Sequence, residues 1–156
     1  MQKISLLAGF FRFQENQNAK TVKKMTIQER AETAAYYKQK GMLNCCQAVV
    51  KVFSDSVECD EENLLKMAAG FASGMGGMEA TCGSLVGACM IAGLKTGGNG
   101  TAKIARELLS TFKEKSGAVA CKDLKGVETG KVLCECVDCV RNAVYSLDEV
   151  FEHTSI

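Results

Sequence analysis

Residues 81–96 read TCGSLVGACMIAGLKT and contain the longest apolar run of the chain, Leu85–Leu94. A run of this length suits a helix buried in a protein core and is too short to span a membrane. Glycine-rich segments border it, at Gly70–Met78 before it and at residues 97–100 after it. Because clustered glycines end regular helices, the pattern predicts a central helix over Cys82–Thr96 that follows a glycine-rich turn.

Gly83 and Gly87 lie four residues apart, so they share one face of this helix and leave that face without side-chain bulk. Small residues at this spacing let two helices approach each other closely. We therefore expect a neighbouring helix, or the Gly70–Met78 turn, to press against this face.

Capping signals predict helices on both sides of the central one. Thr26–Glu29 forms a capping box that opens a helix to about Lys40, and Gly41 suits its C-terminal cap. Asn44–Gln47 is a second start of the same kind. Further helices are expected after Asp60, from Thr101 to Lys115 and around Cys136, with a short segment at Cys121–Gly126. Since no proline interrupts these segments, the sequence predicts an all-α fold, a compact bundle of about five to six helices.

The composition bounds the size of the domain and the class of its partners. At 156 residues, with 47% hydrophobic and 24% charged residues, the chain fits one globular domain. Residues 1–25 hold five Lys or Arg side chains and one Glu, whereas the net charge of the whole chain is +1, so the remainder is mildly acidic. An acidic body lacks the basic face that phosphate contacts require, so we expect no nucleic-acid partner.

Residues 1–25 are expected to be a leader and linker outside the core, and residues 26–156 a single helical, cysteine-rich domain. The apolar stretch Ile4–Phe11 imitates a signal peptide, but it is short, and no small-x-small cleavage site precedes Arg12. No other stretch approaches the length of a membrane span. The expected location is cytoplasmic.

Cysteine is the unusual component of this sequence. The nine cysteines are Cys45, Cys46, Cys59, Cys82, Cys89, Cys121, Cys134, Cys136 and Cys139. An odd number without a secretion signal argues against a disulfide scaffold. In a reducing compartment such a set binds metal, carries out redox chemistry or is simply buried.

Cys45 and Cys82 follow the capping residues Asn44 and Thr81, so both are expected in the first turn of a helix. There the unpaired amides and the positive end of the helix dipole stabilise a thiolate and lower the pKa of the cysteine. A thiolate is both a metal ligand and a nucleophile, although cysteine is also a common small buried residue. Cys59 lies among acidic residues that oppose thiolate formation, so no role is expected for it.

The last helix carries a C-x-C and a C-x-x-C in the sequence Cys134-Glu-Cys136-Val-Asp-Cys139. Cys136 and Cys139 share a helix face, so they could bind one metal or join during thiol exchange. No second C-x-x-C and no following histidine accompany them, which argues against a zinc ribbon and a c-type haem. The only histidine, His153, is expected to be solvated, and Cys89 is expected to pack in the core.

Four motifs resemble the redox-active protein family that is named C_GCAxxG_C_C for its cysteine layout. They are Asn44–Ala48, Cys82–Gly87, Cys121–Gly126, and Cys136 ahead of Val140–Val144. The similarity covers roughly residues 26–151, and a related domain occurs in split-Soret-type cytochromes. The resemblance implies a small helical domain with four key cysteines, Cys45, Cys82, Cys121 and Cys136. Ser84 departs from the alanine that is usual after Cys-Gly, and the missing Cys-x-x-Cys-His excludes covalent haem.

Two functions fit these four key cysteines. In the first, they hold an iron–sulfur cluster or another thiophilic metal and transfer electrons to an unknown redox partner. In the second, they cycle as thiol–disulfide pairs without metal. Four cysteines from separate segments suit a metal cage and equally two disulfides, and a homo-oligomer is compatible with either. Both functions require the four sulfur atoms to share one neighbourhood, away from Cys59.

Overall fold

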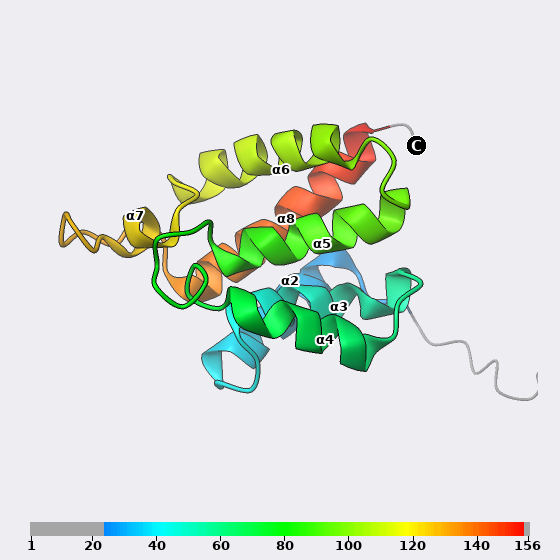
Figure 1. The fold of residues 1–156 in the computed structure, drawn as a ribbon, viewed down its shortest axis with the longest axis horizontal. Coiled ribbons are helices and arrows are strands. Elements are labelled where there is room, and N and C mark those ends of the chain that lie inside the picture. Colours follow the sequence, from blue (N-terminus) through cyan, green and yellow to red (C-terminus); the bar gives the residue numbers. More distant parts are fainter. Residues whose placement is uncertain (1–23, 155–156) are drawn as a thin grey trace, which may run out of the picture.

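The computed structural model describes residues 24–154, which are all-α and contain no strand, as the sequence predicts (Figure 1). The α-helices are α2 (Ile27–Gln39), α3 (Cys45–Phe53), α4 (Glu61–Ala68), α5 (Gly83–Thr96), α6 (Thr101–Ser116), α7 (Cys121–Lys125) and α8 (Cys136–His153). Two 3-10 helices, η1 (Ser54–Ser56) and η2 (Ala69–Phe71), continue α3 and α4. The short segment at Cys121 is therefore a helix of its own, α7. The predicted leader lies almost entirely in residues 1–23, outside the described residues.

Both predicted capping boxes are confirmed. At the start of α2, the amide of Glu29 donates to the Thr26 hydroxyl over 3.2 Å, and the Thr26 amide donates to the Glu29 carboxylate over 2.8 Å. At the start of α3, the Gln47 amide donates to the Asn44 side chain over 2.9 Å, and the Gln47 side chain accepts from the Asn44 amide over 3.2 Å. These bonds satisfy amides that a helix start leaves unpaired, so they define where both helices begin.

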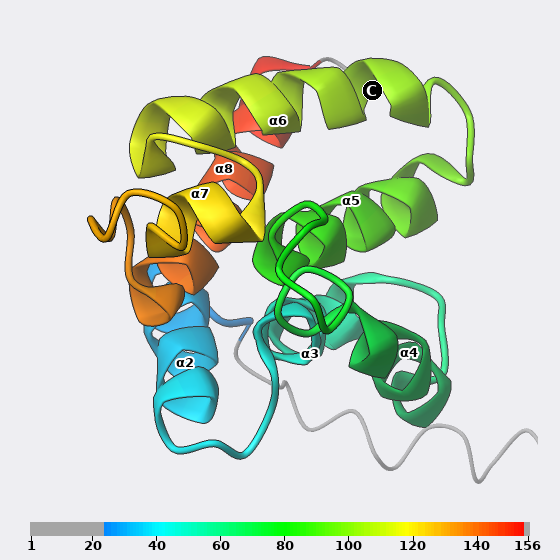
Figure 2. The ribbon, with the colours of Figure 1, turned by 60° about the vertical axis from the view of Figure 1, so that its left-hand side comes forward.

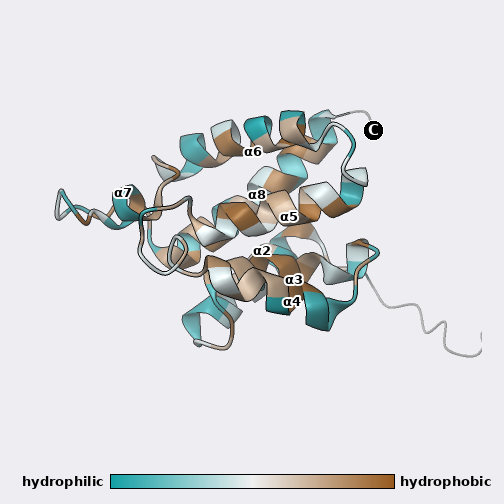
Figure 3. Ribbon diagram, viewed as in Figure 1, coloured by the Kyte–Doolittle hydropathy of each residue, from teal (hydrophilic) through white to brown (hydrophobic). Residues whose placement is uncertain are grey.

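The central helix of the bundle is α5. It packs against α3 on one side and against α6 and α8 on the others, while α2 lies against α8 and α3 (Figure 1, Figure 2). Figure 3 shows hydrophobic residues facing inward between α3 and α5 and hydrophilic residues on the outer faces of α4 and α6. Large side chains that are fully buried in this core include Val49, Leu85, Leu108, Phe112 and Val144. Burying each one stabilises the fold by about 1.5–3 kcal/mol.

No helix in residues 24–154 combines the length and the hydrophobicity that crossing a membrane requires.

The close packing predicted at Gly83 and Gly87 is confirmed. A Cβ atom added at Gly83 would lie 2.4 Å from the carbonyl oxygen of Phe71, and one added at Gly87 would lie 2.8 Å from that of Cys46. Both glycines therefore face main-chain atoms, of η2 and of α3 respectively. Such contacts leave no room for a side chain, because backbone moves less readily than the end of a side chain.

The central helix begins one residue later than predicted, at Gly83. Thr81 does not cap it, because Thr81 lies opposite Ala120 in an isolated antiparallel bridge. The amide of Cys82 donates to the carbonyl of Val119 over 2.8 Å, which keeps the backbone of Cys82 outside the helix. Cys82 therefore occupies the N-cap position and not the first helical turn.

Candidate functional site

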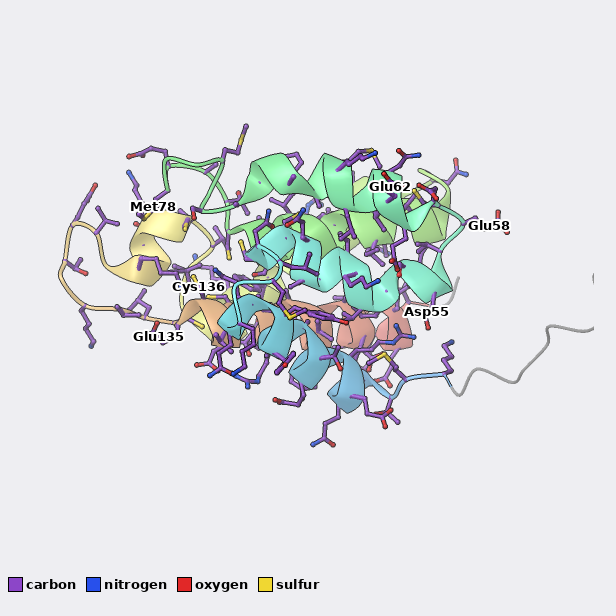
Figure 4. All side chains as sticks on the ribbon, turned by 90° about the horizontal axis from the view of Figure 1, so that it is seen from below. Asp55, Glu58, Glu62, Met78, Glu135 and Cys136 are labelled. Atoms are coloured by element: carbon purple, nitrogen blue, oxygen red, sulfur yellow. The ribbon has the colours of Figure 1, made fainter. Side chains whose placement is uncertain are left out.

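Helices α3, α5, α7 and α8 begin at the same end of the bundle (Figure 2). A pocket of about 80 Å³ is lined by residues from these helix starts. Its lining includes Cys45, Cys82, Cys121, Cys136 and Cys139, and we name it the thiol pocket. The other lining residues are Lys38, Asn44, Ala72, Ser73 and Lys125. All five cysteines are free thiols. Figure 4 shows Cys136 at this end of the bundle, with further sulfur atoms nearby.

The four key cysteines named from the sequence all line this pocket, and each one marks the start of a different helix. Cys45, Cys121 and Cys136 are the first residues of α3, α7 and α8, and Cys82 is the N-cap of α5. Helix starts present unpaired amides and positive partial charge, so this end of the bundle favours negative charge. Whether these cysteines act as metal ligands or as redox thiols stays a prediction.

A short main-chain pairing brings Cys82 and Cys121 together. The amide of Cys82 donates to the carbonyl of Val119 over 2.8 Å, and the amide of Cys121 donates to the carbonyl of Ala80 over 3.0 Å. These two bonds flank the bridge described above at Thr81. The start of α5 and the start of α7 are therefore held side by side although they are far apart in the sequence.

The glycine-rich segment before α5 closes another side of the pocket. Gly74 has a positive φ of 56°, and a Cβ atom placed there would lie 2.7 Å from Cβ of Cys121. Ser73, with a φ of 50°, lines the pocket, and its backbone amide hydrogen-bonds to the Cys45 thiol. Left-handed backbone costs energy at Ser73, which has a side chain, and hydrogen bonds such as that from the Met78 amide to the Ser73 carbonyl, over 2.8 Å, stabilise this conformation of the loop.

Cys82 has the most strongly activated thiol of the pocket. Hydrogen bonding from the neighbouring Cys139 thiol is the main factor that lowers the pKa of Cys82 to about 6, against burial, which would raise it. The Ser84 hydroxyl and the backbone amides of Ser84 and Leu85 lower this pKa further. A thiol with this pKa is largely a thiolate at neutral pH, and a thiolate is the nucleophilic form.

The Ser84 hydroxyl lies between two groups that can each accept its single hydrogen. Its oxygen is 3.1 Å from Sγ of Cys82 and 3.1 Å from the carbonyl oxygen of Cys139, and the side chain is fully buried. When Cys82 is a thiol, its own hydrogen can be donated to Ser84, which then donates to the Cys139 carbonyl. When Cys82 is a thiolate, the Ser84 hydrogen can turn from the Cys139 carbonyl to Sγ of Cys82 and add to the other hydrogen bonds that stabilise the charge.

Three other thiols of the pocket hold their protons more tightly. Burial raises the pKa of Cys45 and of Cys121, and the hydrogen bond to Cys82 raises that of Cys139. The expectation that a first-turn position lowers the pKa is therefore wrong for Cys45. Removal of the thiolate from water outweighs both the helix start and the Ser73 amide, because desolvation penalises the charged form.

Two lysines add positive charge to the pocket. Nζ of Lys125 donates to the carbonyl of Cys134 over 2.7 Å and lies 3.8 Å from Sγ of Cys139. Burial would lower the pKa of Lys125, but its interactions with the neighbouring cysteines, Cys139 and Cys136 first among them, outweigh burial and raise it. Lys38 faces the pocket from α2, and its charge lowers the pKa of Cys45 slightly. Both lysines favour thiolates in their neighbourhood.

The remaining cysteines do not line the thiol pocket. Cys46 is fully buried beside Sδ of Met90 at 3.8 Å, and Cys89 packs against the core as predicted. Cys134 is buried, and its sulfur lies 3.7 Å from the side-chain nitrogen Nδ2 of Asn142. Cys59 lies in the loop before α4, away from the pocket, as expected. The solvated position predicted for His153 is also confirmed.

Three residues of this site are not among the four key cysteines that the sequence predicts: Cys139, Ser84 and Lys125. For Cys139 a signal existed, because it shares a helix face with Cys136. Ser84 departs from the family pattern, but the sequence alone does not show that its hydroxyl lies next to Cys82. Nothing in the spacing indicates Lys125, since its place follows from how α7 packs against α8.

The arrangement of donors bears on the predicted metal site. Within residues 24–154, no three Cys, His, Asp or Glu side chains converge as a single bound metal ion requires. A tetrahedral zinc site, for example, places four donors about 2.0–2.3 Å from one point. In an iron–sulfur cluster the thiolates bind different iron atoms, so they lie further apart than the ligands of one ion.

Comparison with protein families identifies the chain. Residues 43–150 match the family described as "Putative redox-active protein (C_GCAxxG_C_C)", and this range includes all five cysteines of the thiol pocket. The chain belongs to this family. The resemblance noted in the sequence is thereby confirmed, and the redox activity in the name of the C_GCAxxG_C_C family agrees with a pocket lined by free thiols. No curated protein and no solved structure matches the chain.

Proposed function

We propose that this C_GCAxxG_C_C protein is a thiol–disulfide redox protein in which Cys82 is the nucleophile and Cys139 the partner thiol. The observation that carries the proposal is geometric: Cys82 and Cys139 line the same small pocket, and the Ser84 hydroxyl lies 3.1 Å both from Sγ of Cys82 and from the carbonyl oxygen of Cys139. An exchange reaction needs one thiol that ionises near neutral pH and a second that stays protonated until it is used. Cys82 meets the first requirement and Cys139 meets the second.

The reaction with a disulfide RSSR has two steps. The Cys82 thiolate attacks one sulfur, which forms a mixed disulfide and releases RS⁻ as the S–S bond breaks. The Cys139 thiol then gives its proton to the released thiolate and attacks Sγ of Cys82, which forms the Cys82–Cys139 disulfide and expels the second RS⁻. The protein loses two electrons and RSSR gains them. A dithiol reductant reverses both steps.

The other three thiols of the pocket extend this chemistry. Cys45, Cys121 and Cys136 line the same small space, so each can receive the disulfide from Cys82 by a further exchange. All nine cysteines of the chain are free thiols, which fits a reducing compartment, so the location that we propose is the cytoplasm.

An iron–sulfur cluster for electron transfer is the second candidate, and a specific observation favours it. Five thiols from four helix starts surround one pocket, which is more than an exchange pair requires. Cys45, Cys82, Cys121 and Cys136 would hold the cluster, whose iron atoms would carry single electrons. The helix starts and the Lys38 and Lys125 ammonium groups would offset the negative charge of the thiolates.

Peptide mapping after mild oxidation tests the exchange proposal. Protein purified without oxygen and reduced is treated with a small disulfide, and its cysteine pairs are located by mass spectrometry. We expect a Cys82–Cys139 disulfide that is lost in Cys82→Ser and in Cys139→Ser. The control variant Cys59→Ser, altered outside the pocket, should still form it. Oxidation confined to Cys59, with the pocket thiols unchanged, would disprove the proposal.

Iron and sulfide analysis of the same oxygen-free protein distinguishes the two candidate functions. A bound cluster would give iron and inorganic sulfide in equal amounts and a visible absorption band, lost in Cys121→Ser and in Cys136→Ser. These two variants should leave the Cys82–Cys139 exchange intact if the protein works without metal.

A further inference from the structure

We propose that the thiol pocket selects small anionic disulfides, such as those that carry carboxylates, over cationic ones. The inference rests on the proposed thiol exchange and names the class of substrate that the same pocket would take. It is carried by the charges that line the pocket, by their lack of internal partners and by the size of the pocket.

The charged side chains that line the thiol pocket are all cationic. Lys38 and Lys125 line it, and no Asp or Glu does. The acidic residues closest in sequence to the lining, Asp123, Glu135 and Asp138, are exposed and are not part of the lining. The two ammonium groups outnumber the single thiolate of Cys82. An entering group therefore meets positive charge, which attracts an anion and repels a cation.

The charges of these lysines are not neutralised by carboxylates of the protein. Within residues 24–154, Lys38 and Lys125 take part in none of the ion pairs, whereas Lys122, also on α7, pairs with Glu79 and Glu128. The Lys125 ammonium is held by a main-chain carbonyl, that of Cys134, which orients it without removing its charge. A carboxylate on a ligand would give both lysines the partner that they lack inside the protein.

The size of the pocket restricts the ligand to a short chain. A volume of about 80 Å³ accommodates roughly five or six non-hydrogen atoms, since one water needs about 10–15 Å³ on the same measure. One arm of a small disulfide has this size: a sulfur, one or two carbons and a carboxylate. An arm of this length places its charge a few ångströms from the sulfur that Cys82 attacks, within reach of the lysine ammonium groups.

Two small disulfides of similar length and opposite charge test the inference. Dithiodiglycolate carries two carboxylates, and cystamine carries two ammonium groups. The rate at which each reacts with Cys82 is measured by mass spectrometry on the reduced full-length protein near neutral pH. The two disulfides also differ in their leaving groups, which affects their rates with any thiol. The ratio of the two rates with Cys82 is therefore divided by the ratio of the rates at which 2-mercaptoethanol reacts with the same two disulfides.

We expect the corrected ratio to favour dithiodiglycolate by about tenfold at low ionic strength and to fall in about 0.5 M salt, which screens charges over a few ångströms. Lys38→Gln and Lys125→Gln should each reduce the preference severalfold. Lys125→Arg keeps the charge and should retain the preference, which separates charge from any damage to the fold. The control variant Lys40→Gln, altered at an exposed lysine outside the pocket, should behave like the parent protein.

Failure of this inference is distinguishable from failure of the proposed function. Equal corrected rates, or a preference for cystamine, would overturn the anionic selectivity while leaving exchange at Cys82 intact. Absence of any mixed disulfide at Cys82 with both reagents would overturn the exchange itself and the inference with it.

Discussion

At the scale of single residues, Ser84 supplies one hydroxyl hydrogen that two acceptors share. In Ser84→Ala the Cys82 thiolate loses this donor, so we expect the pKa of Cys82 to rise by about 1, since a hydrogen bond to a charged group contributes about 1.5–3 kcal/mol and part of it is replaced. The rate of alkylation of Cys82 as a function of pH measures this change. Ser146→Ala is the matched control, because the Ser146 hydroxyl is also buried but has no partner within residues 24–154. An unchanged profile in Ser84→Ala would show that the hydroxyl serves only the Cys139 carbonyl.

The different pKa values of the pocket thiols lead to a second prediction at this scale. Near neutral pH Cys82, with a pKa of about 6, is mostly ionised, whereas Cys45 and Cys121, whose pKa values are raised, remain protonated. A small alkylating reagent should therefore label Cys82 before Cys45 and Cys121, and the difference should shrink as the pH rises and the other two ionise. Time-resolved peptide mapping measures the order. Earlier labelling of Cys45 would show that its helix start outweighs its burial.

At the scale of elements, two glycines of α5 are predicted to respond oppositely to the same change. Gly87→Ala places a Cβ atom 2.8 Å from the Cys46 carbonyl oxygen, so it should separate α3 from α5 and destabilise the fold by about 1–3 kcal/mol. Gly93→Ala meets only the methyl group of Thr101, at 3.9 Å, and should stabilise α5 by about 0.5–1 kcal/mol, because alanine loses less conformational entropy in a helix. Urea denaturation of both variants measures the two effects. Equal stability of the variants would mean that α3 does not press on Gly87.

At the scale of the whole molecule, an ion pair at the end of the bundle opposite the thiol pocket connects its stability to pH. The guanidinium of Arg30 is nearly fully buried over the Phe53 ring and makes two bonds to the Asp55 carboxylate, of 2.7 and 2.8 Å. Figure 4 shows Asp55 and Cys136 at opposite ends of the bundle. The hydrogen bonds from Arg30 lower the pKa of Asp55. A carboxyl whose pKa is lowered by folding stabilises the fold above its ordinary pKa, and this contribution is lost as the pH falls through the lowered value.

Asp55→Asn should therefore destabilise the protein near neutral pH by about 1–2 kcal/mol, a figure reduced because the carboxylate is half exposed. The difference between the variant and the parent should disappear in strong acid, where Asp55 of the parent is protonated. Urea denaturation at a series of pH values checks this, and oxidation of Cys82 serves as the control for an intact thiol pocket. A difference that stays constant down to strong acid would show that the ion pair is not its cause.

Local signals in the sequence were sufficient for most of the secondary structure. Thr26–Glu29 and Asn44–Gln47 each contain the complete set of groups that caps a helix, so both helix starts follow from neighbouring residues alone. Thr81 was an incomplete signal of the same kind. Its competing partner, the strand-like segment at Ala120, lies far away in the sequence, so the later start of α5 could not be inferred locally.

The sequence by itself determined the all-α fold, the family and the four cysteines that meet at one end of the bundle, because caps, glycine spacing and cysteine motifs act over a few residues. Only the tertiary structure decided which thiols are activated. The pKa of a cysteine depends on burial and on hydrogen bonds from other elements, and these oppose each other differently at each site. Cys45 and Cys82 have similar local signals, yet burial controls the first, whereas Cys139 and Ser84 control the second. Such contacts between distant segments are a property of the packed bundle.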